Sequence, residues 1–172
     1  LQPYAPFDRV VSIEMIEHVR NHALLLEQLC SLLTDDGALY FHFFCHDRYP
    51  YLFEEQSDTD WMTQYFFRGG MMPARDLMHD ISPRVKLVES WVWPGTHYQQ
   101  TAEAWLMQHD ANRAAIMEIF KRHYGPNEAK RWFQRWRIFY LSVAELFGYR
   151  GGQEWYVMHC LLRKNDKLSS PK

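Results

Sequence analysis

The sequence predicts an α/β fold built around a parallel βαβ unit, and three observations lead to this prediction. The run Phe7–Ile13 is short, apolar and rich in β-branched residues, as in a buried parallel strand. Apolar residues at helical spacing follow within Ala23–Leu33. Ala38–Cys45 is a second apolar run, separated from that helix by the turn sequence DDG. A strand, a helix and a strand in this order require a right-handed crossover between parallel strands.

The remaining elements follow in order along the chain. They are a helix over Asp60–Phe67 capped by Asp58, a short helix over Pro73–His79, a strand over Val85–Trp93, a helix from Thr96 or Thr101 to Tyr124, an amphipathic helix from Asn127 to Gly148 or to Gly151-Gly152, and a strand over Glu154–Arg163. The sequence has no repeat and no linker, so we expect one domain over residues 1–164 and a polar tail over 165–172. The helices at about 96–148 are inserted before the last strand.

Composition limits the class of protein. The 172 residues are 47% hydrophobic and carry a net charge of -2, which excludes a disordered tail, a collagen-like repeat and a nucleic-acid binder driven by positive charge. No apolar run reaches the length of a transmembrane span, and no leader precedes a cleavage site. Three widely spaced cysteines without a CxxC motif indicate reduced thiols. We therefore expect a soluble cytoplasmic protein, and a homodimer stays open.

Two carboxylates and an imidazole follow the first strand. Ligands of α/β sheets bind beyond the carboxyl ends of the strands, where Glu14, Glu17 and His18 lie. If the chain turns helical after Ile13, the three side chains share one helical face. Burial and neighbouring like charges would raise a carboxyl pKa toward neutrality, which suits a general base. The alternative is that these acids only cap the helix that follows, and the spacing leaves both interpretations open.

The second strand also carries ligand-type side chains. His42 and His46 share one face of that strand, whereas Cys45 points to the opposite face. No fourth ligand has matching spacing, so we expect no metal site. A polar contact from His42 near Glu17 is one interpretation, and an ordinary core histidine is the other.

An aromatic stripe runs along the inserted helices. Its members recur at helical spacing and are Trp105, Trp132, Trp136, Phe139 and Tyr140, with Glu145 near the edge of the stripe. Such stripes are more often plain core. The alternative is a lid whose ring faces attract an organic cation. The basic residues of the last helix lie mostly off the stripe and are expected to be solvated.

Sequence motifs of phosphate and nucleotide binding do not occur. The chain contains no G-x-G-x-x-G, P-loop, G-x-S-x-G or H-E-x-x-H sequence, and its eight glycines fall in turns.

Several stretches together resemble one enzyme family. They are FDRVVSIEMIEHVRNH, LLTDDGALYFHFFCH, DWMTQYFFRGGMMP, HYQQTAEAWL and RWRIFYLSVAELFGYRGGQEW. In this order they are similar to class I S-adenosylmethionine-dependent methyltransferases of the group that contains coclaurine N-methyltransferase and the cyclopropane-fatty-acid synthases. The resemblance implies the carboxyl-terminal half of a Rossmann-like methyltransferase sheet, with the helical lid before its last strand.

The resemblance also implies an activity and site residues. Cyclopropane synthases usually carry glycine where this chain has Glu14, and a cysteine near Ala144. The sequence here is therefore closer to the plant-type N-methyltransferases, in which Glu14, Glu17 and His18 would orient and deprotonate an amine. The lid residues Trp132, Trp136, Phe139, Tyr140 and Glu145 would bind the substrate, and Ile13 would contact S-adenosylmethionine.

Two alternatives remain beside amine N-methylation. Glu17, His42 and Tyr98 match the bicarbonate site of the cyclopropane synthases, so methylene transfer to an unsaturated lipid stays open. The first strand and glycine-rich loop that hold the cofactor in this family would precede Leu1. We therefore expect the isolated chain to bind the cofactor weakly, and a non-catalytic module is the second alternative.

Overall fold

A computed structural model describes residues 5–55, 60–79 and 81–165. Contacts between residues divide the chain into two compact units. The sheet unit comprises Leu1–Trp93 and Val157–Lys172, and the helical unit comprises Pro94–Tyr156. Asp58, the predicted helix cap, lies outside the described residues.

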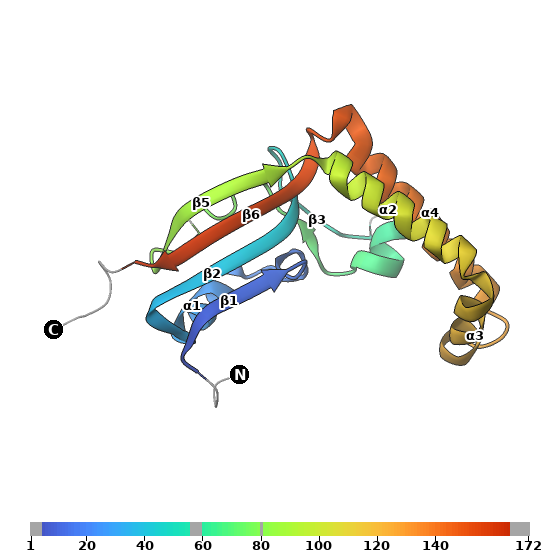
Figure 1. The fold of residues 1–172 in the computed structure, drawn as a ribbon, viewed down its shortest axis with the longest axis horizontal. Coiled ribbons are helices and arrows are strands. Elements are labelled where there is room, and N and C mark those ends of the chain that lie inside the picture. Colours follow the sequence, from blue (N-terminus) through green and yellow to red (C-terminus); the bar gives the residue numbers. More distant parts are fainter. Residues whose placement is uncertain (1–4, 56–59, 80, 166–172) are drawn as a thin grey trace. The chain divides into compact units, whose positions relative to one another are not determined.

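The sheet unit is built on four strands in the order β1-β2-β6-β5 (Figure 1). Their bounds are Phe7–Ile13 for β1, Leu33–His46 for β2, Val85–Trp93 for β5 and Trp155–Lys164 for β6. Strand β1 runs parallel to β2, and β5 runs antiparallel to β6. Helix α1 (His22–Ser31) connects β1 to β2, which confirms the predicted βαβ unit.

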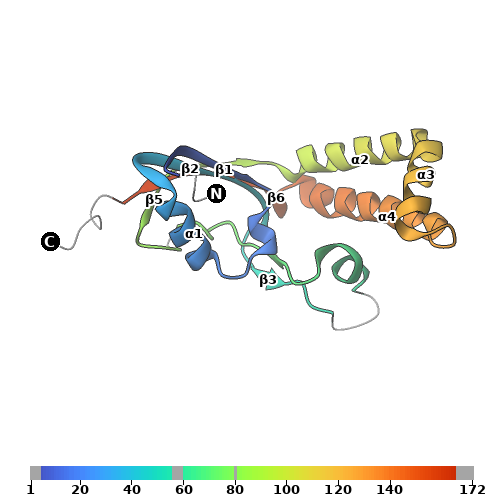
Figure 2. The same cartoon turned by 90° about the horizontal axis from the view of Figure 1, so that it is seen from below.

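One face of this sheet is covered and holds the core. Figure 2 shows α1 against that face. Leu39, Phe41 and Phe43 alternate along β2 and are almost completely buried, together with Leu26 of α1. Apolar burial of this kind supplies most of the stability of such a unit.

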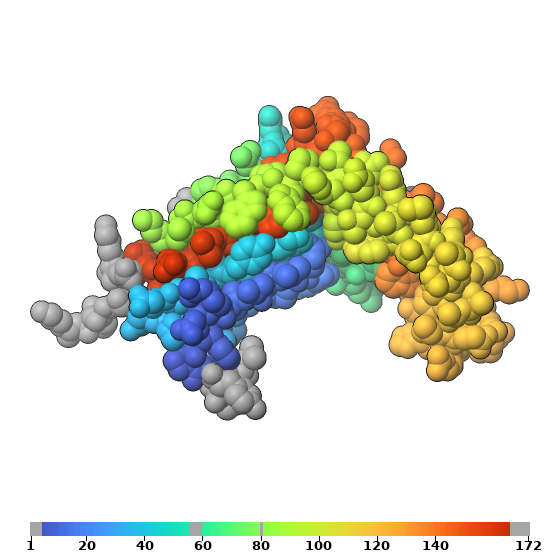
Figure 3. All heavy atoms as spheres, in the orientation of Figure 1, coloured from blue at the N-terminus to red at the C-terminus, as the bar shows by residue number. Residues whose placement is uncertain are grey.

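The other face of the sheet is open among the described residues. Figure 3 shows this face, where atoms of β1, β2 and β5 lie at the surface. Val11 and Ile13 are 61% and 60% exposed, so the prediction that β1 is buried is wrong on this side. The physical reason is position: β1 is the end strand of the described sheet, and no described helix covers its second face.

Three sequence predictions in the sheet unit need correction. The DDG sequence at 35–37 is not a turn that separates the helix from the strand, because β2 already begins at Leu33. The strand is irregular there: β1 advances from Phe7 to Arg9 while β2 advances from Leu33 to Ala38. The predicted helix over 60–67 is reduced to a short helical segment, of which Thr63–Phe67 is a π-helical turn.

The third correction concerns Pro73–His79, which forms turns instead of a helix. The backbone N–H of His46 donates to the Pro73 carbonyl oxygen at 2.9 Å, and the Arg75 N–H donates to the His46 carbonyl oxygen at 3.1 Å. These bonds hold Ala74 in an isolated parallel bridge beside His46 of β2. The short strands β3 (Tyr51–Leu52) and β4 (Met71–Met72) pair antiparallel in a second small sheet.

The helical unit contains α2 (Gly95–Ala111), α3 (Arg113–Tyr124) and α4 (Ala129–Gly148). Helices α2 and α4 lie side by side (Figures 1 and 2). The predicted single helix to Tyr124 is broken at Asn112, whose side-chain amide donates to the Gln108 carbonyl oxygen at 2.8 Å. The unit packs around Ala102, Phe133, Val143 and Phe147.

At the base of the helical unit, the start of α2 lies against the chain that follows α4. The Gly95 N–H donates to the Gly152 carbonyl oxygen at 2.9 Å. A Cβ atom at Gly95 would collide with the backbone carbonyl oxygens of Phe147 and Trp155. Glycine is required here because two backbone segments approach each other directly.

Candidate active site

The carboxyl end of β1 continues into a sharply turned residue, Glu14. Its backbone N–H donates to the His42 carbonyl oxygen at 3.0 Å, and its φ of 50° lies in the left-handed region. Glu14 Oε1 lies 3.1 Å from His42 Nδ1. Glu14 is therefore tied to His42 of β2 through both its backbone and its side chain.

Glu17 is the most unusual side chain of this region. It lies in the short 3-10 turn Ile16–His18 and is completely buried. The Phe44 backbone N–H donates to Glu17 Oε1 at 3.0 Å, whereas the buried Oε2 atom has no hydrogen-bond partner among the described residues. Burial raises the pKa of Glu17 to about 8, and the negative charge of Glu14 adds to this rise.

The surroundings of His42 favour its charged form, whereas those of Glu17 favour the neutral form. The Glu14 carboxylate, 3.1 Å away, raises the pKa of His42, and partial burial opposes that rise. Glu14, His42 and Glu17 thus form one cluster, the Glu14–His42–Glu17 cluster, in which an ion pair lies beside a carboxyl group that is easily protonated. The sequence alternative that treats Glu17 only as a helix-capping acid does not account for its burial.

His18 follows Glu17 in the chain but is not buried with it. It is exposed and stacks on Phe67 with ring centres 6.2 Å apart. The predicted common helical face does not form, because Glu14 is left-handed and the turn at Ile16–His18 is only three residues long. Ile13 is exposed at the end of β1.

His46 and Cys45 contribute to the structure of the sheet unit. His46 Nδ1 accepts hydrogen bonds from the backbone N–H groups of Arg48 and Tyr49, at 2.9 and 3.0 Å. Cys45 is fully buried. Within residues 5–55, 60–79 and 81–165, no three or more His, Cys, Asp and Glu side chains are grouped to hold a metal ion.

Sequence reasoning missed two residues beside His42. His159 of β6 lies with its ring centre 4.9 Å from that of His42, and its Nδ1 atom is 2.6 Å from the Tyr40 hydroxyl oxygen. The only signal in the sequence is a histidine within the apolar strand EWYVMHCLLR. Its contact with His42 depends on strand order, which periodicity does not reveal.

The helical unit holds a pocket of about 450 Å³. Four aromatic side chains and four others line it: Trp105, Trp136, Phe139, Tyr140, Gln108, His109, Asn112 and Ile116. Burial lowers the pKa of His109, which keeps its ring neutral, and its Nε2 atom lies 3.2 Å from the Phe133 carbonyl oxygen. The pocket therefore offers mostly ring faces with a few neutral polar groups.

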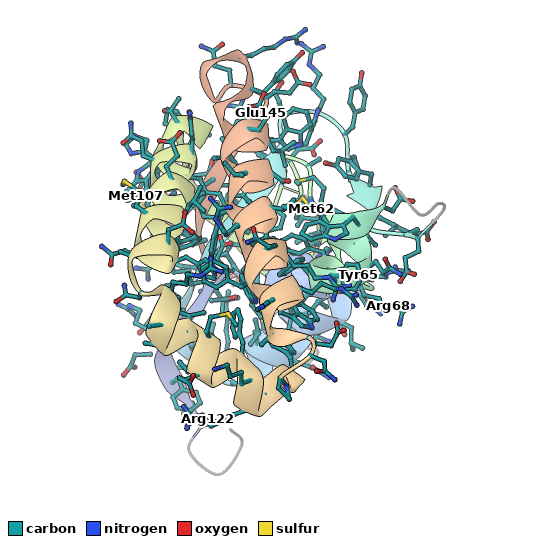
Figure 4. The ribbon with its side chains drawn as sticks, turned by 90° about the vertical axis from the view of Figure 1, so that its right-hand side faces the viewer. Met62, Tyr65, Arg68, Met107, Arg122 and Glu145 are labelled. Carbon is teal, nitrogen blue, oxygen red and sulfur yellow. The ribbon has the colours of Figure 1, made fainter. Side chains whose placement is uncertain are left out.

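Three residues predicted to bind substrate do not line this pocket. Trp132 stacks on Tyr124 with ring centres 4.3 Å apart. Tyr98 packs edge-to-face against Phe147 at 4.5 Å. Glu145 is exposed on α4, as Figure 4 shows.

Among the described residues, no helix is both long and apolar enough to cross a membrane.

Comparisons with known proteins agree with these features. The mycolic acid cyclopropane synthetase family model matches residues 2–147. The chain is 35% identical to (S)-coclaurine N-methyltransferase of Papaver somniferum, over 92% of this chain and 46% of the relative. It is 28% identical to pavine N-methyltransferase of Thalictrum flavum subsp. glaucum, over 92% of this chain and 45% of the relative. The chain thus spans about half the length of the curated relatives it matches.

Solved structures give the same result for the fold. Coclaurine N-methyltransferase bound to N-methylheliamine and SAH superposes with a TM-score of 0.85 at 34% identity, over 92% of this chain and 49% of that chain. The cyclopropane synthase MmaA2 from Mycobacterium tuberculosis superposes with a TM-score of 0.71 at 20% identity, over 94% of this chain and 56% of that chain. The predicted α/β methyltransferase fold is confirmed. The chain belongs to the mycolic acid cyclopropane synthetase family.

Proposed function

We propose that the protein carrying this chain transfers a methyl group from S-adenosylmethionine to the nitrogen of a small amine, with Glu17 as the base. One observation carries the proposal: a fully buried carboxyl group with a pKa of about 8 and a buried oxygen that lacks a hydrogen-bond partner among the described residues. The similarity to coclaurine N-methyltransferase supports the choice of an amine.

The described residues fit one side of a cofactor site. Ile13 is exposed at the carboxyl end of β1, where α/β sheets hold their ligands. Glu17 comes four residues later in the sequence, and its buried Oε2 atom has no hydrogen-bond partner among the described residues. When bound, S-adenosylmethionine supplies an electrophilic methyl group. Ile13 would form part of the wall that holds it.

Within this chain, the chemical task is proton removal. An amine nitrogen attacks only through a free lone pair, so its proton has to be taken up. Glu17 Oε2 is suited to accept that proton, since a base with a pKa near 8 is well matched to neutral or mildly alkaline conditions. Glu14, held by His42, supplies a negative charge that would orient an ammonium group. His18 follows Glu17 directly in the chain, and we propose that it relays the proton.

The helical unit offers a surface for the apolar part of a substrate. The ring faces of Trp105, Trp136, Phe139 and Tyr140 line its pocket, and such faces attract both aromatic rings and cations. We propose that this pocket binds an aromatic or cationic organic group.

The Glu14–His42 ion pair argues against bicarbonate chemistry. Bicarbonate is an anion, and the Glu14 carboxylate already occupies the position 3.1 Å from His42 Nδ1. Glu14 would have to leave before an anion could bind there. Methylene transfer to a lipid is therefore the less favoured function.

We also propose a cytoplasmic location. Its support is chemical: Cys30, Cys45 and Cys160 are all free and buried, as expected in a reducing compartment.

The test is steady-state kinetics of the complete protein that carries this chain, with S-adenosylmethionine and coclaurine as the amine. We expect Glu17→Gln to lower kcat by about a hundredfold while changing KM much less, because it removes the base and preserves the shape of the side chain. In the parent protein, kcat/KM should rise with pH through about 8, as Glu17 ionises.

Glu89→Gln is the matched control, because Glu89 is an exposed acid on β5 of the same unit. A Glu17→Gln variant with kcat within about threefold of the parent would overturn the role of Glu17. A parent protein that methylates no amine but modifies an unsaturated phospholipid would favour the cyclopropane synthase activity. A parent that acts on neither would favour a non-catalytic role.

A further inference from the structure

A second group of side chains lies beside His42 on the open face of the sheet, and the proposed function makes no use of it. Tyr40 comes from β2, His159 from β6, and Trp91 and Trp93 from β5. These residues meet because β6 lies between β2 and β5 in the sheet. In the register of the strands, Trp91 is directly opposite His159.

His159 is enclosed by this group. Trp91 stacks on its ring almost in parallel, with ring centres 5.3 Å apart and planes at 4°. Trp93 packs against it at 4.6 Å. As a result, only 2% of His159 is exposed, although both tryptophans face the surface. A histidine held this way has a fixed ring orientation.

Hydrogen bonding sets the tautomer of His159. Burial raises the pKa of the Tyr40 hydroxyl, so Tyr40 keeps its proton. The Tyr40 hydroxyl oxygen lies 2.6 Å from His159 Nδ1, so one of the two groups donates a hydrogen bond to the other. If Tyr40 is the donor, the ring hydrogen of neutral His159 lies on Nε2, a buried atom without a hydrogen-bond partner among the described residues.

The neutral state of His159 matters to His42. The two rings meet edge-to-face, with planes at 82° and centres 4.9 Å apart. Two imidazolium ions at this distance would repel each other. Burial and the neighbouring His42 lower the pKa of His159, whereas Glu14 raises the pKa of His42. His42 is thus the ring of the two that carries the proton.

We propose that Tyr40 and His159 are positioning residues: the Tyr40 hydroxyl locks His159 as the neutral Nε2–H tautomer, and this ring holds His42 in the orientation that meets Glu14. The inference deepens the proposed function and rests on it for the role of the Glu14–His42 pair. The titratable groups that face His42 are Glu14 after β1, Glu17 in the 3-10 turn and His159 on β6. Those that face His159 are Tyr40 and His42.

The experiment is long-range ¹H–¹⁵N NMR of the histidine rings of this chain, which reports the tautomer and the protonation of each ring. Spectra would be recorded between about pH 5.5 and 8, where imidazoles titrate. The samples are the parent chain, Tyr40→Phe, and Tyr149→Phe as a control that removes an exposed hydroxyl from the helical unit.

In the parent chain, we expect His159 to stay neutral with its hydrogen on Nε2 while His42 takes up a proton. Tyr40→Phe should give a mixture of His159 tautomers and lower the titration midpoint of His42 by about half a pH unit or more, because His159 can then compete for the proton. Tyr149→Phe should change neither. A purely structural role for Tyr40 would lower the melting temperature and leave both ring signatures unchanged.

Two results would overturn the inference. One is a parent chain in which His159 carries its hydrogen on Nδ1, or becomes protonated before His42. The other is a folded Tyr40→Phe variant with the ring signatures of the parent. If Tyr40→Phe does not fold, the tautomer in the parent chain decides alone. No turnover is measured, so this outcome is separate from that of Glu17→Gln.

Discussion

At the scale of single residues, the chain buries an ionisable group, the carboxyl group of Glu17. Glu17 is held by one backbone hydrogen bond from Phe44, which is too little to offset complete burial of a carboxylate. The carboxyl group therefore keeps its proton up to about pH 8. Stability is thereby given up at neutral pH to hold a group whose charge can change.

This cost is measurable as a pH dependence of stability. The pKa of Glu17 is about 8 in the folded chain, whereas its ordinary value is 4.5, so the folded state binds more protons between these pH values. The free energy of unfolding should therefore fall as pH rises from about 4.5 to about 8, by on the order of 5 kcal/mol as an upper limit.

Urea unfolding of the parent chain and of Glu17→Gln across this range tests the prediction. The variant should show a flatter profile, because glutamine does not ionise. Equal slopes for both proteins would mean that Glu17 ionises normally in the folded chain.

At the scale of elements, local pattern was sufficient for some segments and not for others. The bounds of β1 and β5 and the end of α4 at Gly148 follow from β-branched runs, alternation and glycine punctuation. Pro73–His79 has helix-like sequence but forms turns, because hydrogen bonds to His46 outweigh a weak local preference. No local pattern reports such a long-range competitor.

The residues of the candidate site likewise fall into those that local sequence pattern predicts and those that it does not. The grouping of Glu14, Glu17 and His42 is predictable because strand ends concentrate polar side chains in α/β sheets. His18 was misplaced because a helical face was extrapolated through a left-handed residue. His159 and Tyr40 were missed because their meeting depends on the pairing of strands far apart in sequence.

The contact between the start of α2 and the chain after α4 makes its own prediction. Gly95→Ala should destabilise the protein by about 3 kcal/mol, since the new methyl group would meet backbone carbonyl oxygens that cannot rotate away. Gly148→Ala is the matched control. Its methyl group would meet only the side chain of Gln99, which can move, so a change of about 1 kcal/mol or less is expected.

Denaturant unfolding followed by circular dichroism compares the two variants. The interpretation of Gly95 as a backbone contact fails if Gly95→Ala and Gly148→Ala are equally stable.

At the scale of the whole molecule, the chain spans about half the length of its relatives and carries no G-x-G-x-x-G sequence. In nucleotide-binding α/β folds such a sequence lets the backbone approach the cofactor closely. We therefore expect the 172-residue polypeptide alone to bind S-adenosylmethionine weakly, with no shift in melting temperature at about 1 mM cofactor.

Isothermal titration calorimetry of the same polypeptide gives a second readout, with the complete protein that carries this chain as the positive control. A micromolar dissociation constant for the polypeptide alone would mean that the strand end around Ile13 suffices to hold the cofactor.

The left-handed backbone of Glu14 has an evolutionary consequence. At a φ of 50°, glycine is accommodated without penalty, whereas a residue with a Cβ atom costs about 1 kcal/mol. A carboxylate and a bare glycine can therefore exchange at this position without rebuilding the loop. With glycine at this position, the Nδ1 atom of His42 would be free to contact a bound anion. With glutamate, it contacts the carboxylate of the protein itself.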